Sequence, residues 1–186
     1  MNTAIERIFV PLTTAQAPDV SKPFLEDIRK SNGFIPLLMA ILTNSPTVLE
    51  VYLALDTAWE NGSFPPRERQ IILLAASVEN HCTYCTTMHS VILTNTLGTA
   101  TEIVSAIRNN DPLPDAKLNA LVTLVKELVR ERGYAHKVTV QNFLAAGYRK
   151  QQVMELLLGI ALKTISNHLE HILSAPVDQE FAIEGG

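Results

Sequence analysis

Prolines and glycines divide most of this chain into short segments, and within each segment the apolar residues recur every three to four positions. That spacing is the period of an amphipathic helix, and the alternating pattern typical of strands is scarce. Because proline starts helices well and glycine ends them, these residues indicate helix boundaries. The sequence therefore predicts an all-α fold, a compact multi-helix bundle without a sheet.

The first twenty residues contain Pro11 and Pro18 and show no helical period, which predicts an extended N-terminal arm over residues 1–20. A chain of 186 residues is of single-domain size, so residues 21–186 are expected to form one all-helical domain. The expected helices cover 21–33, the segments after Pro36 and after Pro46, 67–80, the cysteine-containing segment to about 96, 99–108, 114–132, 138–146 and 151–174.

Charge and hydropathy exclude several classes of protein. Hydrophobic residues make up 47% of the chain, which excludes intrinsic disorder. The net charge is −4 and no basic face is visible, so we expect no nucleic-acid partner. No apolar run approaches the ~20 residues that span a bilayer, and the N-terminus lacks the pattern of a signal peptide, which predicts a cytoplasmic protein with no membrane partner. The low charged fraction, 18%, predicts apolar surface buried in a homo-oligomer.

The two cysteines, Cys82 and Cys85, form a Cys-x-x-Cys pair that is followed by His89. On a helix these three side chains share one face, and a break at Asn80 predicts that the helix starts close to the cysteines. A thiol reacts as thiolate, which a nearby imidazole and the N-terminal N–H groups of a helix both favour. The second thiol can convert an oxidised first one into a disulfide. The pair therefore predicts redox chemistry.

Three other interpretations of this segment remain open. A zinc or iron site could use Cys82, Cys85 and His89 with His81 or Glu79, although structural zinc sites usually show a second ligand pair elsewhere. A thioredoxin fold would place its cysteines after a strand, and no βαβ pattern is present. The cysteines could also be ordinary buried residues. We expect no metal and no cofactor.

The run from Pro66 to Ala75, followed by Cys82-Thr83-Tyr84-Cys85 and His89, resembles the core of the alkylhydroperoxidase D-like branch of the carboxymuconolactone decarboxylase family. Residues 159–178 resemble the same branch more loosely. The resemblance implies an all-α domain, with a redox core at about 46–109, that assembles as trimers or as hexamers built from dimers. It also implies thiol-dependent reduction of hydroperoxides without haem or metal.

The resemblance implies a role for each matching residue. Cys85 matches the cysteine that attacks the peroxide, Cys82 its disulfide partner that faces the reductant, and His89 the histidine that relays protons. The position of the family's relay glutamate is occupied by Gln70, whose amide can hydrogen-bond but cannot exchange a proton as a carboxylate does. Tyr84 stands where some members place a second histidine.

Another carboxylate is expected to replace the missing relay glutamate. If the helix is continuous, Glu79 points at the same site as Cys82, and Glu68 on the preceding helix is the alternative. The residues expected to bind substrate or to support the cysteines are Gln70, Tyr84 and His81.

The leading hypothesis is a thiol-dependent peroxidase or disulfide reductase of antioxidant defence. Its substrate would be an organic hydroperoxide or hydrogen peroxide, and its reductant a dithiol on a lipoyl- or thioredoxin-like protein. One alternative is a carboxymuconolactone-type decarboxylase, which would need a cationic site, for which Arg67 and Arg69 are the nearest basic residues. The other is a non-catalytic redox-sensing oligomer.

Overall fold

The computed structural model describes residues 9–173 and 177–181, and the regular structure within these ranges is helical, as the sequence predicts. No helix of the described ranges is long and apolar enough to cross a membrane. The elements are η1 (Asp19–Ser21), α1 (Lys22–Asn32), α2 (Leu37–Leu42), α3 (Pro46–Glu60), α4 (Pro66–Glu79), α5 (Thr83–Val91), η2 (Ile92–Thr96), α6 (Thr101–Asn109), α7 (Ala116–Arg130), α8 (Lys137–Ala145), α9 (Lys150–Leu173) and η3 (Gln179–Phe181).

The helix boundaries follow the prolines and glycines of the sequence. Pro46 and Pro66 are the first residues of α3 and α4, and Gly33 ends α1 in the left-handed conformation with φ 83°. The start of α7 differs from the prediction by two residues. The Asp115 carboxylate accepts the N–H groups of the next helical turn, so this side chain, and not Pro114, fixes where α7 begins.

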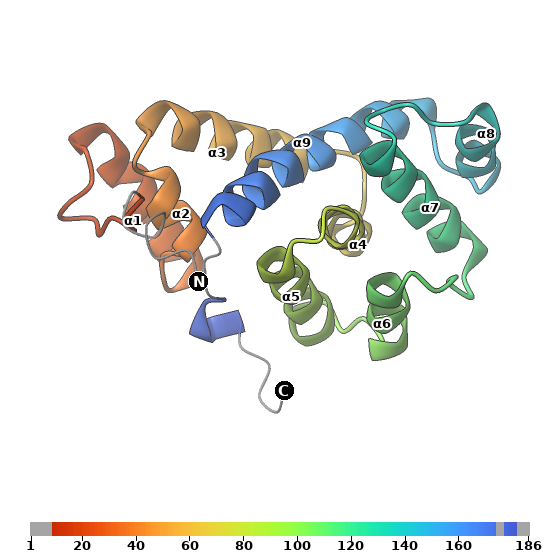
Figure 1. Cartoon of the computed structure of the whole chain (residues 1–186), viewed down its shortest axis with the longest axis horizontal. Helices are drawn as coiled ribbons and strands as arrows, with labels where there is room; N and C mark the ends of the chain where they lie inside the picture. The colour runs from red at the N-terminus through yellow and green to blue at the C-terminus, as the bar shows by residue number, and fades with distance from the viewer. Residues whose placement is uncertain (1–8, 174–176, 182–186) are drawn as a thin grey trace.

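Helix α4 lies at the centre of the bundle, in contact with α5, α6, α7 and α9 (Figure 1). The sequence predicts one apolar face for this helix, but residues 71–77 are buried without interruption. Because neighbouring helices cover α4 on every side, each of its side chains in that stretch is removed from water. The helix that precedes the cysteines is therefore the core of the fold.

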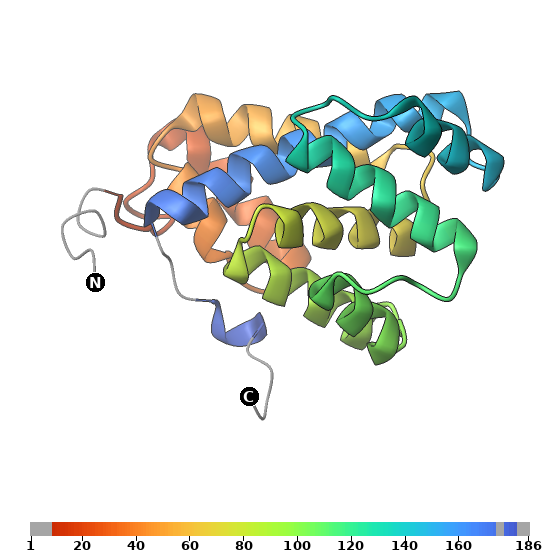
Figure 2. The same cartoon turned by 45° about the vertical axis from the view of Figure 1, so that its right-hand side comes forward.

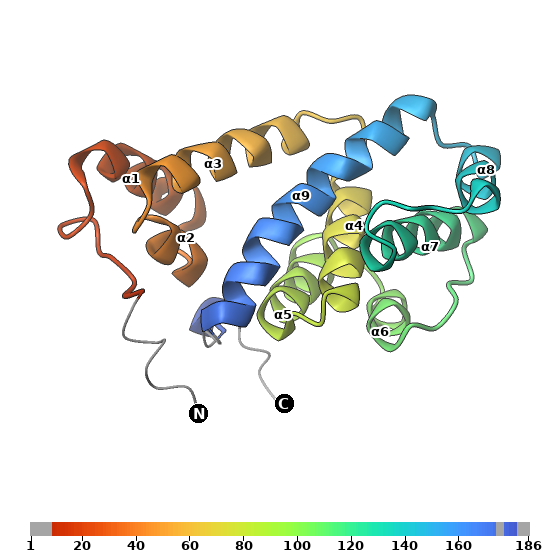
Figure 3. The same cartoon turned by 45° about the horizontal axis from the view of Figure 1, so that its top comes forward.

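Helix α9 crosses α3 and α4 at close range (Figures 2 and 3). The approach depends on Gly159, where an added Cβ would lie 3.0 Å from Cη2 of Trp59 and 3.3 Å from Cγ2 of Ile72. The indole of Trp59 is fully buried at this crossing. This contact sets how closely α9 packs on α3 and α4. The next two turns of α9 place Lys163 and Ser166 near α5.

The predicted N-terminal arm lies partly outside the described residues. Within it, the N–H of Leu12 donates to the carbonyl oxygen of Ala40 at 3.0 Å, and η1 begins at Asp19. The division into an arm and a single domain stays a prediction, and the domain's predicted range also includes 174–176 and 182–186, which lie outside the described residues. At the other end of the chain, Asp178 accepts the N–H of Leu37 at 3.1 Å.

Candidate functional site

The two cysteines lie at the start of α5, directly after a sharp turn. Helix α4 ends at Glu79, and His81 adopts a left-handed conformation with φ 57°, which is uncommon outside glycine. Cys82 is the N-cap of α5, and its Sγ accepts the backbone N–H of Cys85 at 3.4 Å. The turn therefore places both thiols at the positive end of the helix dipole.

Cys82 and Cys85 are free thiols, and both are buried. The hydrogen bond from Cys82, which outweighs the opposing effect of burial, lowers the pKa of Cys85 to about 5, and the charge of Lys163 and hydrogen bonds from Lys163 and Ser166 act in the same direction. The same hydrogen bond, together with burial, raises the pKa of Cys82. Cys85 is thus the thiolate of the pair and Cys82 its neutral partner.

His89 connects two helices across the site. Its Nδ1 lies 2.8 Å from Oε1 of Gln70 on α4, and its Nε2 lies 2.9 Å from Nζ of Lys163 on α9. Burial, and then the charge of Lys163, hold the pKa of His89 well below its ordinary value, so the imidazole is neutral. Ser166, one turn after Lys163, lies with its Oγ 3.9 Å from Sγ of Cys85.

Lys163 and Ser166 are site residues that reasoning from the sequence missed. Lys163 is only 2% exposed, and it belongs to α9, the longest helix of the described residues. A lysine is almost never fully buried without a partner, so its position inside an apolar helical stretch was the available signal. Cys82, Cys85 and His89 lie at the start of α5 and within it, and Lys163 of α9 contacts His89 and interacts with Cys85.

The two expected relay carboxylates lie in other surroundings. Glu79 pairs with Arg130 at 3.6 Å, and Glu68 pairs with Lys117 at 3.7 Å. The premise that a continuous helix carries Glu79 toward Cys82 is wrong, because the chain turns at His81. A relay role for either carboxylate stays a prediction, and the side chains that contact His89 are those of Gln70 and Lys163.

The other expected supporting residues lie on different sides of the cysteines. His81 is exposed and lines a cleft together with Cys82. Tyr84 is buried, and its hydroxyl donates to Asp178, the residue that also accepts the N–H of Leu37. Burial, followed by hydrogen bonding to Asp178, raises the pKa of Tyr84, so its hydroxyl keeps its proton.

Two cavities lie along different faces of α5, one lined by His89 and the other by Cys82. The first, of about 650 Å³, is bounded by the α5 side chains Tyr84, Met88 and His89. Gln70 and Lys163 also line it, and most of its remaining wall is apolar; these apolar residues include Phe34, Leu38, Met39, Leu73, Leu162 and Phe181. The second, of about 420 Å³, opens at Cys82 between threonines of α5 and the end of α6.

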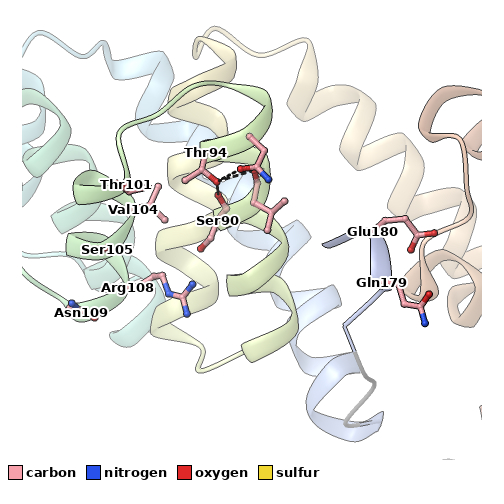
Figure 4. A pocket seen from close by; sticks show the side chains of 11 residues that line it. Ser90, Thr94, Thr101, Val104, Ser105, Arg108, Asn109, Gln179 and Glu180 are labelled. Carbon is pink, nitrogen blue, oxygen red and sulfur yellow. Dashed lines mark hydrogen bonds between the residues drawn. The ribbon is translucent and has the colours of Figure 1, made fainter. Parts of the chain in front are cut away.

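A third hollow, of about 960 Å³, extends between α5–η2 and α6 (Figure 4). Hydroxyl side chains face it from both sides, among them Ser90 and Thr94 on one side and Thr101 and Ser105 on the other. Arg108 lines both this hollow and the cleft at Cys82. The surface next to Cys82 is therefore polar, whereas the cavity next to His89 is mainly apolar.

The arrangement of the site suits thiol chemistry better than metal binding. Both ring nitrogens of His89 are engaged, one by an amide and one by an ammonium group. Within residues 9–173 and 177–181, no group of three His, Cys, Asp or Glu side chains is placed to hold a metal ion. A thiolate, a neutral thiol and a cation lie together instead.

Comparison with known proteins identifies a family. The sequence model of the carboxymuconolactone decarboxylase family matches residues 46–127, from the start of α3 into α7. The comparison with curated proteins finds no match.

Several solved structures share the fold of this chain. The alkylhydroperoxidase AhpD core of an uncharacterized peroxidase-related protein from Ralstonia eutropha JMP134 superposes with a TM-score of 0.80 at 18% identity, covering 93% of each chain. An uncharacterized peroxidase-related protein from Silicibacter sp. TM1040 gives 0.78 at 15% identity, again over 93% of each chain. The debrominase Bmp8 gives 0.77 at 17% identity over 94% of each chain.

Bmp8 has also been solved as a cysteine-to-alanine variant in complex with 2,3,4-tribromopyrrole. At these low identities the likeness establishes the fold, and the family model adds the relationship in sequence. Residues 46–127 therefore match the sequence model of the carboxymuconolactone decarboxylase family, and the chain shares the fold of an alkylhydroperoxidase AhpD core, in agreement with the resemblance to the alkylhydroperoxidase D-like branch.

Proposed function

We propose that this protein is a thiol-dependent peroxidase of antioxidant defence, in which Cys85 attacks a hydroperoxide and Cys82 resolves the product. The family and the fold support a general antioxidant or carboxymuconolactone decarboxylase-type function. The observation that carries the finer proposal is the asymmetry of the thiols, because a Cys85 pKa of about 5 leaves it ionised at neutral pH.

The proposed reaction proceeds in two steps. The Cys85 thiolate attacks the distal oxygen of the hydroperoxide, the O–O bond breaks, and the products are Cys85 sulfenic acid and an alkoxide that takes up a proton. Cys82 then gives its thiol proton to the departing hydroxyl group, and its sulfur bonds to the Cys85 sulfur as the S–O bond of the sulfenic acid breaks, so that a disulfide and water form. The protein loses two electrons and the peroxide gains them.

A dithiol closes the cycle by thiol–disulfide exchange at Cys82. The cleft at Cys82 supports this assignment, since it is open to solvent and is lined by small polar residues. A lipoyl- or thioredoxin-like protein has the required chemistry, because its second thiol releases the mixed disulfide. Reduction returns both cysteines of the pair to the state described above.

The cavity at His89 supports organic hydroperoxides as substrates over hydrogen peroxide. Its wall is mainly apolar, and a volume of about 650 Å³ admits a hydroperoxide with a bulky carbon skeleton. Hydrogen peroxide would react at the Cys85 sulfur without using the apolar wall of this cavity.

We further propose a homo-oligomer, a trimer or a hexamer, because apolar side chains such as Met154 and Leu157 on α9 are exposed in the single chain.

A single-turnover experiment tests the proposed function. The reduced protein is mixed with one equivalent of cumene hydroperoxide, and free thiols and intact mass are followed. We expect loss of both thiols and a mass decrease of about 2 Da, faster than for a free dithiol. Cys85→Ser should abolish the reaction, whereas Cys82→Ser should stop at a sulfenic acid, with a mass increase of about 16 Da.

The alternatives give different results in the same experiment. Oxidation no faster than that of a free dithiol contradicts the proposed peroxidase and favours the decarboxylase alternative. A decarboxylase needs a cation in its site, and Lys163, which the sequence analysis did not identify, supplies one. Rapid disulfide formation without turnover by any dithiol supports the redox-sensing oligomer.

A further inference from the structure

We propose that Lys163 is the catalytic acid of this site: its ammonium group holds Cys85 as a thiolate and then gives its proton to the alkoxide that leaves. The inference rests on the proposed peroxidase function and adds to it a residue and a step. At the position where the resemblance implies a relay glutamate this chain has an amide, Gln70, and the charged group beside His89 is the ammonium of Lys163 on α9.

The position of Lys163 fits this role. Its Nζ donates to Nε2 of His89 at 2.9 Å, and it forms part of the wall of the mainly apolar cavity. The same ammonium group interacts by charge and by hydrogen bonding with Cys85, whose Sγ lies beside Ser166 one turn further along α9. Lys163 therefore borders both the attacking sulfur and the space that the hydroperoxide would fill.

Gln70 and Lys163 are matched partners through His89. An ammonium group can only donate hydrogen bonds, so Nε2 of His89 must accept, and the ring proton must lie on Nδ1. That proton needs an acceptor, and Oε1 of Gln70 lies 2.8 Å away. A glutamate at position 70 would favour an imidazolium, whose second N–H would face the ammonium group. The amide keeps His89 neutral, and the lysine can stay charged beside it.

The ionisable groups that face Lys163 come from several helices. Tyr52 and Asp56 of α3 both interact with its charge, as do Cys85 and Cys82 of the α5 turn. Burial raises the pKa of Tyr52, and burial together with the Glu60 carboxylate raises that of Asp56. Only for Cys85, among these four, is the pKa lowered, and Lys163 contributes to that lowering both by its charge and by hydrogen bonding.

The proton balance closes over one cycle. The Cys85 proton transfers to the Lys163 amine when the disulfide is reduced, which regenerates the thiolate–ammonium pair. After attack on the hydroperoxide, the ammonium group protonates the alkoxide and becomes an amine. The dithiol supplies two electrons and two protons, so the sum is hydroperoxide plus dithiol giving alcohol, water and disulfide.

A thiolate titration tests the first half of the inference without any turnover. Absorbance at 240 nm is followed against pH for each reduced protein and for its Cys85→Ser counterpart, and the difference isolates Cys85. The unaltered protein should titrate with a midpoint near pH 5. Lys163→Met should raise the midpoint by at least one pH unit, about tenfold in thiolate stability. Lys126→Met is the matched control, because Lys126 is also buried but bonds Ile107 and Asn110.

A leaving-group comparison tests the second half. Lys163→Arg keeps the positive charge, but a guanidinium group does not release its proton. With cumene hydroperoxide, whose alkoxide needs a proton, the single-turnover rate of Lys163→Arg should fall about 100-fold. With peracetic acid, which releases a stable carboxylate, the rate should stay within about threefold of the unaltered protein. A merely structural role for Lys163 would slow both reactions equally.

The two proposals fail in different ways. If the unaltered protein does not reduce hydroperoxides, the proposed function is wrong, yet the titration still measures the effect of Lys163 on Cys85. If peroxide is reduced rapidly and the midpoint of Lys163→Met equals that of the Lys126→Met control, the inference is overturned. Equal slowing of cumene hydroperoxide and peracetic acid by Lys163→Arg overturns the acid role.

Discussion

The crossing of α9 over α3 and α4 gives a prediction whose sign depends on one side chain. Replacing Gly159 by alanine adds a Cβ at 3.0 Å from Cη2 and 3.2 Å from Cζ2 of Trp59, and at 3.3 Å from Cγ2 of Ile72. Carbon atoms in good contact lie at about 3.5–4.0 Å, so all three distances are too short. The indole of Trp59 is fully buried and packs against Phe64, so it cannot move away.

Two opposing terms set the size of the effect. An extra methyl group in a packed core costs about 1–3 kcal/mol, and alanine in place of glycine inside a helix returns about 1 kcal/mol. We therefore expect Gly159→Ala to lower the free energy of unfolding by about 1 kcal/mol. Gly159→Val adds further atoms and lacks the helix propensity of alanine, so it should cost more than about 3 kcal/mol.

The change in the free energy of unfolding is measured by urea unfolding of four proteins: the unaltered chain, Gly159→Ala, Trp59→Phe and the double variant. Phenylalanine lacks Cη2 and Cζ2, the two nearest atoms of the indole. In the Trp59→Phe background, Gly159→Ala should therefore become slightly stabilising, by less than about 1 kcal/mol, because the helix-propensity gain is then opposed only by the 3.3 Å contact with Ile72. The reasoning is refuted if Gly159→Ala stabilises the unaltered chain, or if its effect is the same in both backgrounds.

Three further substitutions concern carboxylates away from the thiols. Burial raises the pKa of Glu155, but hydrogen bonds from the Ser63 hydroxyl and N–H outweigh it and leave the pKa lowered, so its stabilisation is present at neutral pH and lost as the pH falls below 4.5. Glu155→Gln should lower the free energy of unfolding by about 1 kcal/mol at pH 7, with the difference shrinking toward pH 3 in thermal unfolding; a constant difference would contradict the pKa argument. Glu79→Gln and Glu68→Gln should leave single-turnover peroxide oxidation within about twofold, because each carboxylate pairs with a surface cation, and a tenfold loss in either would restore it as the relay acid.

Much of the fold was predictable because its signals are local. Proline, glycine and helical period predict most of the helix boundaries, and Cys82 at the N-terminus of α5 follows from the break after α4. The complete burial of α4 was not predictable in this way. An all-round apolar helix and a one-sided one differ in how many neighbours they have, which depends on the packing of distant segments.

In the candidate site, too, the placements that depend on local spacing were predictable and those that depend on distant segments were not. Cys85 and His89 lie one turn apart on the same helix, α5, and spacing alone predicts that placement. Lys163 reaches His89 from 74 positions away along the chain, and spacing carries no information about that approach. For Glu79 the prediction failed for another reason, because helical spacing was applied beyond the end of α4. The left-handed turn at His81 interrupts the helix, and the helical spacing no longer holds beyond it.

The placement of the two cavities on different faces of α5 has a consequence for steady-state kinetics. One cavity meets His89 and Lys163, and the other meets Cys82, so an oxidant and a reductant would occupy separate spaces. An apolar alcohol that fills the first space should compete with the hydroperoxide and leave the apparent affinity for the dithiol unchanged. Saturating dithiol should likewise cause no substrate inhibition against the peroxide, and the reductant can dock before the alcohol departs because the two molecules would occupy different cavities.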